Sequence, residues 1–345
     1  MQDSNMTALP AISRLISVWQ GWLSSGGLLP YAAAIIAYAV AVLIITSVFA
    51  YIFGWVERKL IARMQHRHGP TYVGKYGIFQ NLADLVKLLT KEYVEPDRAD
   101  RLLMKLGPVL LLGMTTFLIL LVPFSPTLQA TNLGLGLLVL FTAISFFPLL
   151  VFIAGFSSSN KFADISAQRS VLMLLSYELP LIVVIAAAAL LSGGYNISGI
   201  VAAQSKLFYF AIAMPIGLVV FFIAMLAELE RPPFDLREAD SELIAGWLTD
   251  FSGPYYALAL FLDYTRIFLW GLLISLLFFG GWLGPPFLPG VAWLILKAFV
   301  IALFTVVIRA TTVRMRIDRV LRLGWLWLLP LSLINLILAY MIFVA

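Results

Sequence analysis

The chain has 345 residues, of which 62% are hydrophobic and 12% charged, with a mean hydropathy of +0.98 and a formal net charge of +5. Soluble domains are about 45–50% apolar and about 25% charged, so this composition indicates a membrane protein. The chain contains no cysteine, which excludes disulfides, thiolate zinc sites and iron–sulfur ligation by its own residues. The basic excess lies in loops between apolar segments and does not indicate nucleic-acid binding.

Eight apolar segments are long enough to cross a bilayer, because about 20 apolar residues in a helix span its roughly 30 Å hydrocarbon core. They are residues 31–54, 106–124, 133–156, 170–191, 207–227, 255–277, 291–308 and 325–344. The predicted fold class is an all-α polytopic membrane protein with eight transmembrane helices and amphipathic helices in the cytoplasmic loops. Because no repeat is visible, residues 1–345 are predicted to form a single membrane domain.

The basic residues alternate between successive loops. Residues 55–105 hold ten, 157–169 two, 228–254 two and 309–324 five, whereas 125–132 and 278–290 hold none and 192–206 holds Lys206 alone. Basic residues collect in cytoplasmic loops. We therefore expect the odd-numbered loops to be cytoplasmic and both termini to lie on the outer side of the cell membrane.

The first predicted loop is the most charged part of the chain. Residues 57–101 hold 15 of its 41 charged residues, and residues 79–92 place Phe79, Leu82, Val86 and Leu89 on one helical stripe. This pattern predicts an amphipathic helix that lies at the inner interface or beneath a docked subunit. His66 and His68, the only histidines, are too few for a metal site, so interface roles are predicted for both.

Four ionisable residues lie inside predicted spans, where each costs from about 2.5 kcal/mol upward and marks a candidate proton or ion pathway. Asp263 and Arg266 are three residues apart, so they are expected either to pair on one helix face or to serve function. Glu178 has no evident local partner and is a candidate for a proton role. Lys297 is expected to balance Glu178 or to extend to the interface.

The third cytoplasmic loop is acidic. Its residues 228–250 hold seven acids against Arg231 and Arg237, and helical patterning after the Pro-Pro pair places Asp235, Glu238 and Glu242 on one face. Such a face is either solvated or functional. The arginines of residues 309–322 are explained by topology alone, or they face these carboxylates.

Six segments carry a family resemblance that covers about residues 30–344. They read WVERK (55–59), RHGPTYVGKYGIFQNLADLVKLLTKE (67–92), SSNKF (158–162), SYELP (176–180), AELERPPFDLREADSELIAG (227–246) and LRLGWLWLLPLSLINLIL (321–338). In this order they resemble the NuoH-type membrane component of complex I, the proton-translocating NADH:quinone oxidoreductase. Relatives occur in F420H2 dehydrogenases and membrane-bound hydrogenases.

The resemblance implies a chain that works only inside a larger complex and has no activity by itself. It implies that loops 55–105 and 228–254 form a docking surface and a quinone-chamber wall beneath soluble iron–sulfur and quinone-site subunits on the cytoplasmic side. Other small membrane-arm subunits are implied as neighbours in the bilayer. Quinone is the implied substrate, with iron–sulfur clusters and flavin on partner subunits and no prosthetic group on this chain.

The resemblance also assigns candidate site residues. The quinone-chamber candidates are Glu57, Arg58, Arg67, Asp84, Glu228, Arg231 and Asp235. The candidates for coupling quinone reduction to proton translocation are Glu92, Glu178, Glu238, Asp240, Glu242, Asp263 and Lys297.

Several positions depart from the family pattern. Asp240, Asp250 and Asp263 stand where the family usually has Glu, Met173 where Gln is common, and Leu326 where Lys is usual. These departures leave open the electron donor, the kind of quinone and whether the chain serves an F420H2 dehydrogenase or a hydrogenase. An independent ion transporter is the remaining alternative, although it would be expected to show an internal repeat.

Overall fold

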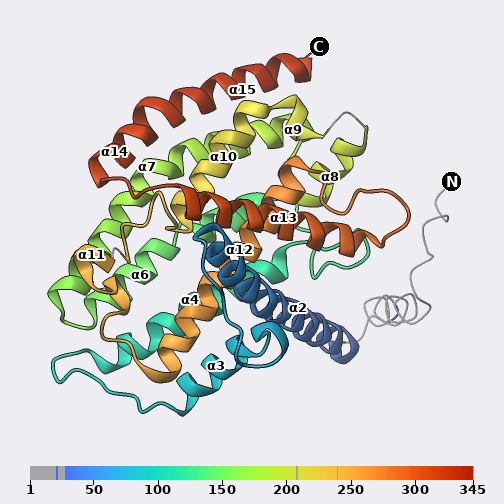
Figure 1. The fold of residues 1–345 in the computed structure, drawn as a ribbon. Helices are drawn as coiled ribbons and strands as arrows, with labels where there is room; N and C mark the ends of the chain where they lie inside the picture. Colours follow the sequence, from blue (N-terminus) through green and yellow to red (C-terminus); the bar gives the residue numbers. More distant parts are fainter. Residues whose placement is uncertain (1–20, 22–27, 207–208, 239, 345) are drawn as a thin grey trace.

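The computed structural model describes residue 21 and residues 28–206, 209–238 and 240–344, without the side chains of 28–31, 206, 240 and 241. Every regular element within these ranges is helical (Figure 1). The elements are α2 (Leu28–Met64), η1 (Lys75–Gly77), α3 (Gln80–Thr90), α4 (Arg101–Leu121), α5 (Gly136–Ile144), α6 (Phe147–Phe156), α7 (Lys161–Ser192), α8 (Ile197–Lys206), α9 (Phe210–Ala213), α10 (Pro215–Glu228), α11 (Asp240–Leu243), η2 (Gly246–Leu248), α12 (Gly253–Phe278), α13 (Gly290–Thr311), α14 (Ile317–Leu323), η3 (Gly324–Leu328) and α15 (Leu329–Val344).

Seven helical segments in the described part of the chain are long and apolar enough to cross a membrane. They are residues 32–64, 101–121, 136–156, 161–192, 253–278, 290–311 and 317–344, and each contains or overlaps one predicted span. The all-helical membrane class is confirmed. Several of these helices reach further than predicted. For example, α2 continues to Met64 and α7 begins at Lys161, so both extend into predicted loops.

The fifth predicted span, 207–227, corresponds to two helices. α9 ends before Met214, and the apolar helix α10 then runs for 14 residues. Pro215 stands at the start of α10, where a proline needs no backbone hydrogen bond. The side chain of Asn335 in α15 accepts a hydrogen bond of 2.9 Å from the Gly217 N–H, which caps the new helix.

α12 is the most buried of the seven long helices and lies inside the bundle, with α4, α13 and α2 packed around it. Its buried apolar side chains cover all directions, as expected of a helix surrounded by other helices. Phe268 and Trp270 pack there against Phe49, Phe141 and Phe221. α12 thereby fixes the positions of the charged residues midway along it.

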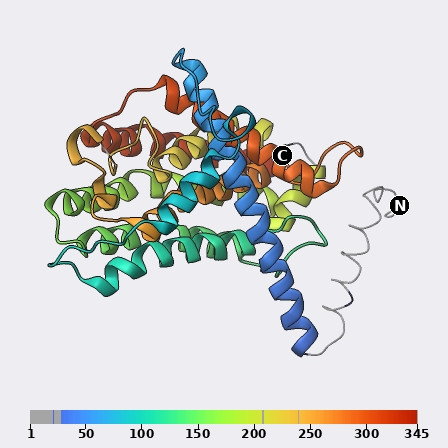
Figure 2. The ribbon, with the colours of Figure 1, turned by 60° about the horizontal axis from the view of Figure 1, so that its bottom comes forward.

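α2 stands at the edge of the bundle, and its first half extends away from the other helices (Figure 2). Its side chains Ile36, Ile44 and Val48 are 63%, 59% and 51% exposed. Its second half packs against α12 and α13. A free apolar face on one half and a packed face on the other bury Glu57 within the protein, whereas Arg63 and Met64 at the end of α2 remain exposed.

α15 packs closely along α7, and the η3 turn that precedes α15 meets the α7 backbone at Gly324. A Cβ atom at Gly324 would lie 1.9 Å from the backbone oxygen of Ser176. Only a glycine permits this approach. Gly324 begins the π-helical turn η3, which joins α14 to α15.

The helix predicted within residues 79–92 corresponds to α3, whose bounds are Gln80–Thr90. Leu82, Val86 and Leu89 are 47–55% exposed. Asp84 and Asn81 face α2 instead: Asp84 pairs with Arg58, and Asn81 donates to the Tyr51 carbonyl oxygen at 2.9 Å. Ile12, Leu15, Ile16, Trp19 and Trp22 recur at helical spacing, which predicts a further short helix with an apolar stripe, and these five residues lie outside the described ranges.

Candidate functional site

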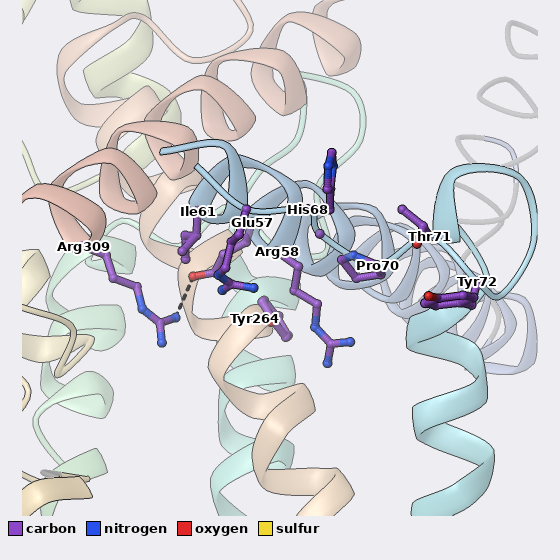
Figure 3. A pocket seen from close by; sticks show the side chains of 11 residues that line it. Glu57, Arg58, Ile61, His68, Pro70, Thr71, Tyr72, Tyr264 and Arg309 are labelled. Carbon is purple, nitrogen blue, oxygen red and sulfur yellow. Dashed lines mark hydrogen bonds and ion pairs between the residues drawn. The ribbon is translucent and has the colours of Figure 1, made fainter. Parts of the chain in front are cut away.

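A pocket of about 800 Å³ opens at the polar ends of α2 and α13 (Figure 3). We call it the basic pocket because three arginines contribute to its wall. Its lining residues are Glu57, Arg58, Ile61, Arg67, His68, Gly69, Pro70, Thr71, Tyr72, Tyr264 and Arg309. Three of the predicted chamber residues, Glu57, Arg58 and Arg67, are therefore in one cavity.

Glu57 is the buried anion at the base of this pocket, with 2% of its surface exposed. Its carboxylate accepts a hydrogen bond of 2.7 Å from Arg309 Nη1 and a close one from Arg231 Nη1, with Arg231 Nη2 at 3.3 Å. Arg231 is also buried. One carboxylate thus joins α2, α13 and the acidic loop, and its two arginine partners are 174 and 252 residues from Glu57 along the chain.

A second group of charges, which we call the carboxylate cluster, lies deeper and contains Glu228, Glu230, Glu238, Asp263, Arg237 and Arg266. Glu228 is buried at the end of α10; it accepts a hydrogen bond from the Tyr177 hydroxyl and lies 3.2 Å from Arg266 Nη2. Glu230 accepts a hydrogen bond of 2.5 Å from the Ser170 hydroxyl and forms a close ion pair with Arg237. Four carboxylates therefore share two guanidinium groups.

The carboxylate cluster continues to the edge of the loop. Arg237 Nη2 lies 3.6 Å from Asp263 Oδ1 and 3.7 Å from Glu238 Oε1. The partial burial of Glu238, together with the charge of Asp263, raises the pKa of Glu238 to about 7. A carboxyl group with this pKa can gain or release a proton at neutral pH.

The basic pocket and the carboxylate cluster are electrostatically connected through Arg231. Burial acts to lower the pKa of Arg231, but the charges of Glu57 and then of Asp263 outweigh it and raise that pKa. A change of charge at Asp263 is therefore felt by the guanidinium that holds Glu57.

Arg58 and Asp84 connect the wall of the basic pocket to α3. Arg58 Nη1 donates to Asp84 Oδ2 at 2.6 Å, and Gln80 Nε2 donates to Asp84 Oδ1 at 3.0 Å. Partial burial acts to raise the pKa of Asp84, but these two hydrogen bonds outweigh it and hold the pKa below its usual range. This predicted chamber residue thus borders the pocket through Arg58.

We expect Asp84→Asn to lower stability by at most about 1 kcal/mol at pH 7, because the pair is partly exposed. A depressed pKa means that the ionised carboxylate stabilises the fold above its unfolded pKa of about 3.9, and that this contribution is lost as the pH falls. The difference in Tm between the wild type and Asp84→Asn should shrink below about pH 4. Asp318→Asn, at an exposed position in α14, is the control. A difference that persists at pH 3 would contradict this assignment.

The predicted helix in the acidic loop is wrong in its extent. Among the described residues of this loop only α11 and the short η2 turn are helical, and Asp235 and Glu238 lie outside both, so they do not share a helix face with Glu242. Glu242 is instead exposed and pairs with Arg169 at 2.7 Å and closely with Arg314. Buried partners on α7 and α12 hold the preceding residues out of a helix, because Glu230 and Arg237 must reach into the carboxylate cluster.

Of the two alternatives for Asp263 and Arg266, the local ion pair is not the one found between these two described residues. Arg266 points to Glu228 and Glu230, whereas Asp263 points to Arg237. Tertiary partners have replaced the local one, since two buried carboxylates attract the guanidinium more strongly than a partly exposed aspartate.

Glu178 lines a separate apolar groove of about 470 Å³ between α7, α5 and α6. No hydrogen bond or ion pair to Glu178 is found among the described residues. Its neighbours on α7, Leu175, Leu179 and Ile182, are 53%, 45% and 46% exposed. The carboxyl therefore lies on a face that a membrane or a neighbouring helix would cover.

Lys297 does not contact Glu178. Its ammonium group donates to the carbonyl oxygens of Phe279, Gly281 and Leu283 at 2.7, 2.8 and 2.6 Å. These carbonyls follow the end of α12, where unpaired acceptors need a donor. The expectation that Lys297 balances Glu178 is thus wrong, and the lysine fastens the loop after α12 instead.

The remaining candidates lie apart from these groups or at their edge. Glu92 is exposed, and no ion pair to it is found in the described ranges. Asp235 is half-buried in the loop that carries Arg237. Asp240 is the first residue of α11, and its side chain is not among those that the structure describes. His68 lines the basic pocket but points away from Arg58 and Arg309 (Figure 3).

Sequence reasoning missed Glu230, Arg237 and Tyr177 as site residues. Glu230 and Arg237 lie in a loop that reads as solvated, and their burial to 8% and 2% exposure depends on distant helices. The usable signal for Tyr177 was its position beside Glu178 in a span. Among the described residues no group of three or more His, Cys, Asp or Glu side chains could hold a metal ion.

These features define a polytopic helical membrane protein with a polar pocket at one end and a buried chain of charges leading from it. A sequence model of the NADH dehydrogenase family matches residues 36–340. The chain is 37% identical to the H subunit of the NADH-quinone oxidoreductase of Carboxydothermus hydrogenoformans, over 91% of each chain, and 39% identical to that of Brevibacillus brevis, over 86% and 90%. The chain therefore belongs to the NADH dehydrogenase family, in the group of H subunits.

A solved structure supports the same fold. The membrane-bound sulfane sulfur reductase, an archaeal respiratory membrane complex, contains a chain that is 27% identical with a TM-score of 0.78. The match covers 88% of this chain and 99% of that one. The fold therefore also occurs in a chain of an archaeal respiratory membrane complex.

Proposed function

We propose that this chain is the membrane component of an NADH:quinone oxidoreductase that forms part of the quinone-binding chamber and couples quinone reduction to proton translocation. The main support is that Glu57 connects the two groups of charges. It lines the basic pocket, and it also binds Arg231, on which the charge of Asp263 in the carboxylate cluster acts. Loops 55–105 and 228–254 would form the chamber wall and the docking surface for soluble iron–sulfur and quinone-site subunits. Those subunits would carry the iron–sulfur clusters and flavin.

The physical basis of the coupling is a change of charge in the pocket. A quinone that is reduced takes up protons. When nearby side chains supply those protons, their charges change, and this alters the electric field on Arg231. Because four carboxylates share Arg237 and Arg266, a proton gained or lost at Glu238 changes which carboxylate each guanidinium prefers. This rearrangement passes the change from the pocket toward Glu228 at the end of α10.

We propose further that α9 and α10 together make the fifth of eight crossings, with both termini on the outer side of the cell membrane. The support is the loop charge pattern, which requires an even number of crossings between the basic loops. The groove at Glu178 would then receive a helix of another small membrane-arm subunit. An isolated carboxyl facing lipid is costly, so a polar partner there would stabilise it.

Glu238→Gln tests the coupling role. The substitution keeps the shape and leaves Arg237 its closer partner Glu230, so the fold should be retained. We expect proton translocation by the intact complex to fall about tenfold and its pH dependence near pH 7 to disappear, because the carboxyl can no longer exchange a proton. Asp318→Asn is the control. Normal translocation with an unchanged pH profile would refute the assignment of Glu238.

A second candidate is a component of a respiratory complex with another electron acceptor, as the similarity to the sulfane sulfur reductase chain indicates. Neighbouring genes for hydrogenase or F420H2 dehydrogenase subunits would favour that alternative. Inhibitor-sensitive quinone reduction by the purified complex would favour the first function. An intact complex that reduces no quinone would exclude the first.

A further inference from the structure

The arginines at and after the end of α13 fall into two sets. Two of them pair with carboxylates of other elements: Arg309 and Arg314. The other three are exposed and form no ion pair within the described part of the chain; they are Arg316, Arg319 and Arg322. Only one acid, Asp318, lies among these three, so residues 316–322 carry two positive charges in excess.

Arg319 and Arg322 stand at the head of an apolar stripe that faces away from the protein. α14, η3 and α15 form one helical segment of 28 residues along the edge of the bundle (Figure 1). Side chains that follow Arg322 at helical spacing are exposed along it; they are Leu326 (66%), Leu333 (46%), Ile337 (61%) and Tyr340 (57%). The segment therefore presents two cations and then apolar surface on one face.

The length of this segment places its arginines at the level of the lipid headgroups. About 20 residues cross the roughly 30 Å hydrocarbon core, so about eight of the 28 extend beyond it. No charged residue follows Arg322, so this excess lies at the α14 end. Trp325 and Trp327 in η3 are 49% and 65% exposed, and exposed tryptophan is typical of the boundary between acyl chains and headgroups. Arg322 and Arg319 then lie about one and two turns beyond this boundary.

The chemistry of this face suits a phospholipid. Guanidinium groups donate to phosphate oxygens in a planar, bidentate geometry. A soluble partner with acidic side chains would neutralise the arginines but would leave the apolar stripe below them uncovered. A phospholipid with net negative charge covers both parts, because its phosphate and its acyl chains have the same order along the membrane normal as the arginines and the stripe.

We propose that α14 and η3 bind the phosphodiester headgroup of an anionic phospholipid, with Arg319 and Arg322 as its ligands and the acyl chains along Leu326 and Ile337. The site shares no residue with the basic pocket, so lipid and quinone do not compete. The inference goes beyond the proposed function and does not depend on it. It is tested by labelling and not by turnover, so a failed quinone assay would leave it standing.

Photo-cross-linking of lipids in nanodiscs tests the proposal. The intact complex that contains the full chain is placed in phosphatidylcholine nanodiscs with a small fraction of phosphatidylglycerol that carries a photoreactive group near its headgroup. Adducts are then mapped by peptide mass spectrometry. We expect adducts on residues 319–327, at a several-fold higher yield than with photoreactive phosphatidylcholine, whose headgroup has no net charge. Inorganic phosphate at millimolar concentration should not lower this yield.

Variants of one arginine identify the ligand residues. Arg322→Gln should lower the yield about fivefold, since one arginine near a membrane surface contributes about 1 kcal/mol. Arg322→Lys should retain most of the yield because the charge remains. Arg63→Gln removes the same charge from the exposed end of α2 and should change nothing. The Tm of all three variants should equal that of the wild type, because neither arginine has an ion pair among the residues that the structure describes.

Four outcomes would overturn the lipid assignment. Equal yields from the two lipids would remove the role of charge, and equal yields from Arg322→Gln and Arg63→Gln would remove the role of this arginine. Loss of the adducts in phosphate would point to a free anion. Absence of adducts on residues 319–327 with both lipids would show that another subunit covers this face.

Discussion

Arg237→Gln is expected to destabilise the protein by about 3–5 kcal/mol, the range seen when one partner of a buried ion pair is removed. Arg237 is 2% exposed, forms the close ion pair with Glu230 and stacks 5.4 Å from the Trp247 ring. Without its guanidinium, Glu230 keeps the Ser170 hydroxyl and the distant Arg266, and Asp263 loses the cation nearest to it. The Tm of the purified complex and the amount of chain retained in it measure this effect.

A double variant separates lost charge balance from lost packing. Glu230→Gln combined with Arg237→Gln removes both members of the pair, so part of the stability should return, because no uncompensated buried charge remains between them. Arg316→Gln, at a position without an ion pair among the described residues, should change stability by no more than about 0.5 kcal/mol. If the double variant is no more stable than Arg237→Gln alone, packing around Trp247 explains the loss and the charge argument fails.

Gly324→Ala is expected to cost about 3 kcal/mol or more, since the added methyl group meets the Ser176 carbonyl oxygen at 1.9 Å and a backbone atom cannot rotate away. α14 and α15 must then move off α7. Ser176 adjoins Tyr177, which holds Glu228, so under the proposed function proton translocation should fall together with stability. Thermal unfolding and proton translocation of the same preparation measure both effects.

Gly113→Ala in α4 is the matched control. Nothing lies within 4 Å of a Cβ atom at Gly113, and the residue is inside a helix. Alanine there should be neutral or stabilising by up to about 1 kcal/mol because of its higher helix propensity. Equal effects of the two substitutions would show that the contact between Gly324 and Ser176 is not tight.

The sequence predicts the helices well where hydrophobicity determines them. The seven long membrane helices each contain or overlap a predicted apolar run, because the need to bury apolar surface in lipid acts residue by residue. The prediction from hydrophobicity fails at the helix ends. α2 continues beyond Glu57 and Arg58, because polar residues form helix as readily as apolar ones once protein surrounds them. The divided fifth span depends on a single proline and on a cap from α15.

The site was predicted less completely, because its contacts are distant in sequence. Glu57 and Arg231 were each identifiable as candidates, but nothing in the sequence shows that Arg309, 252 residues from Glu57, completes their group. The sequence left the partner of Lys297 open, because a charge in a span reads the same whether it faces a carboxylate or three carbonyls. Local spacing also paired Asp263 with Arg266, where the fold offers each a better partner.

The length of α2 has a mechanical consequence. Its 37 residues form a rod of about 55 Å at 1.5 Å per residue, far longer than the roughly 30 Å hydrocarbon core. A helix that exceeds the bilayer adjusts to membrane thickness by tilting. Because one continuous helix carries both the lipid-facing residues and Glu57, any change in its tilt also moves the carboxylate that joins Arg231 and Arg309. The thickness of the surrounding membrane thereby becomes an input to the geometry of the pocket.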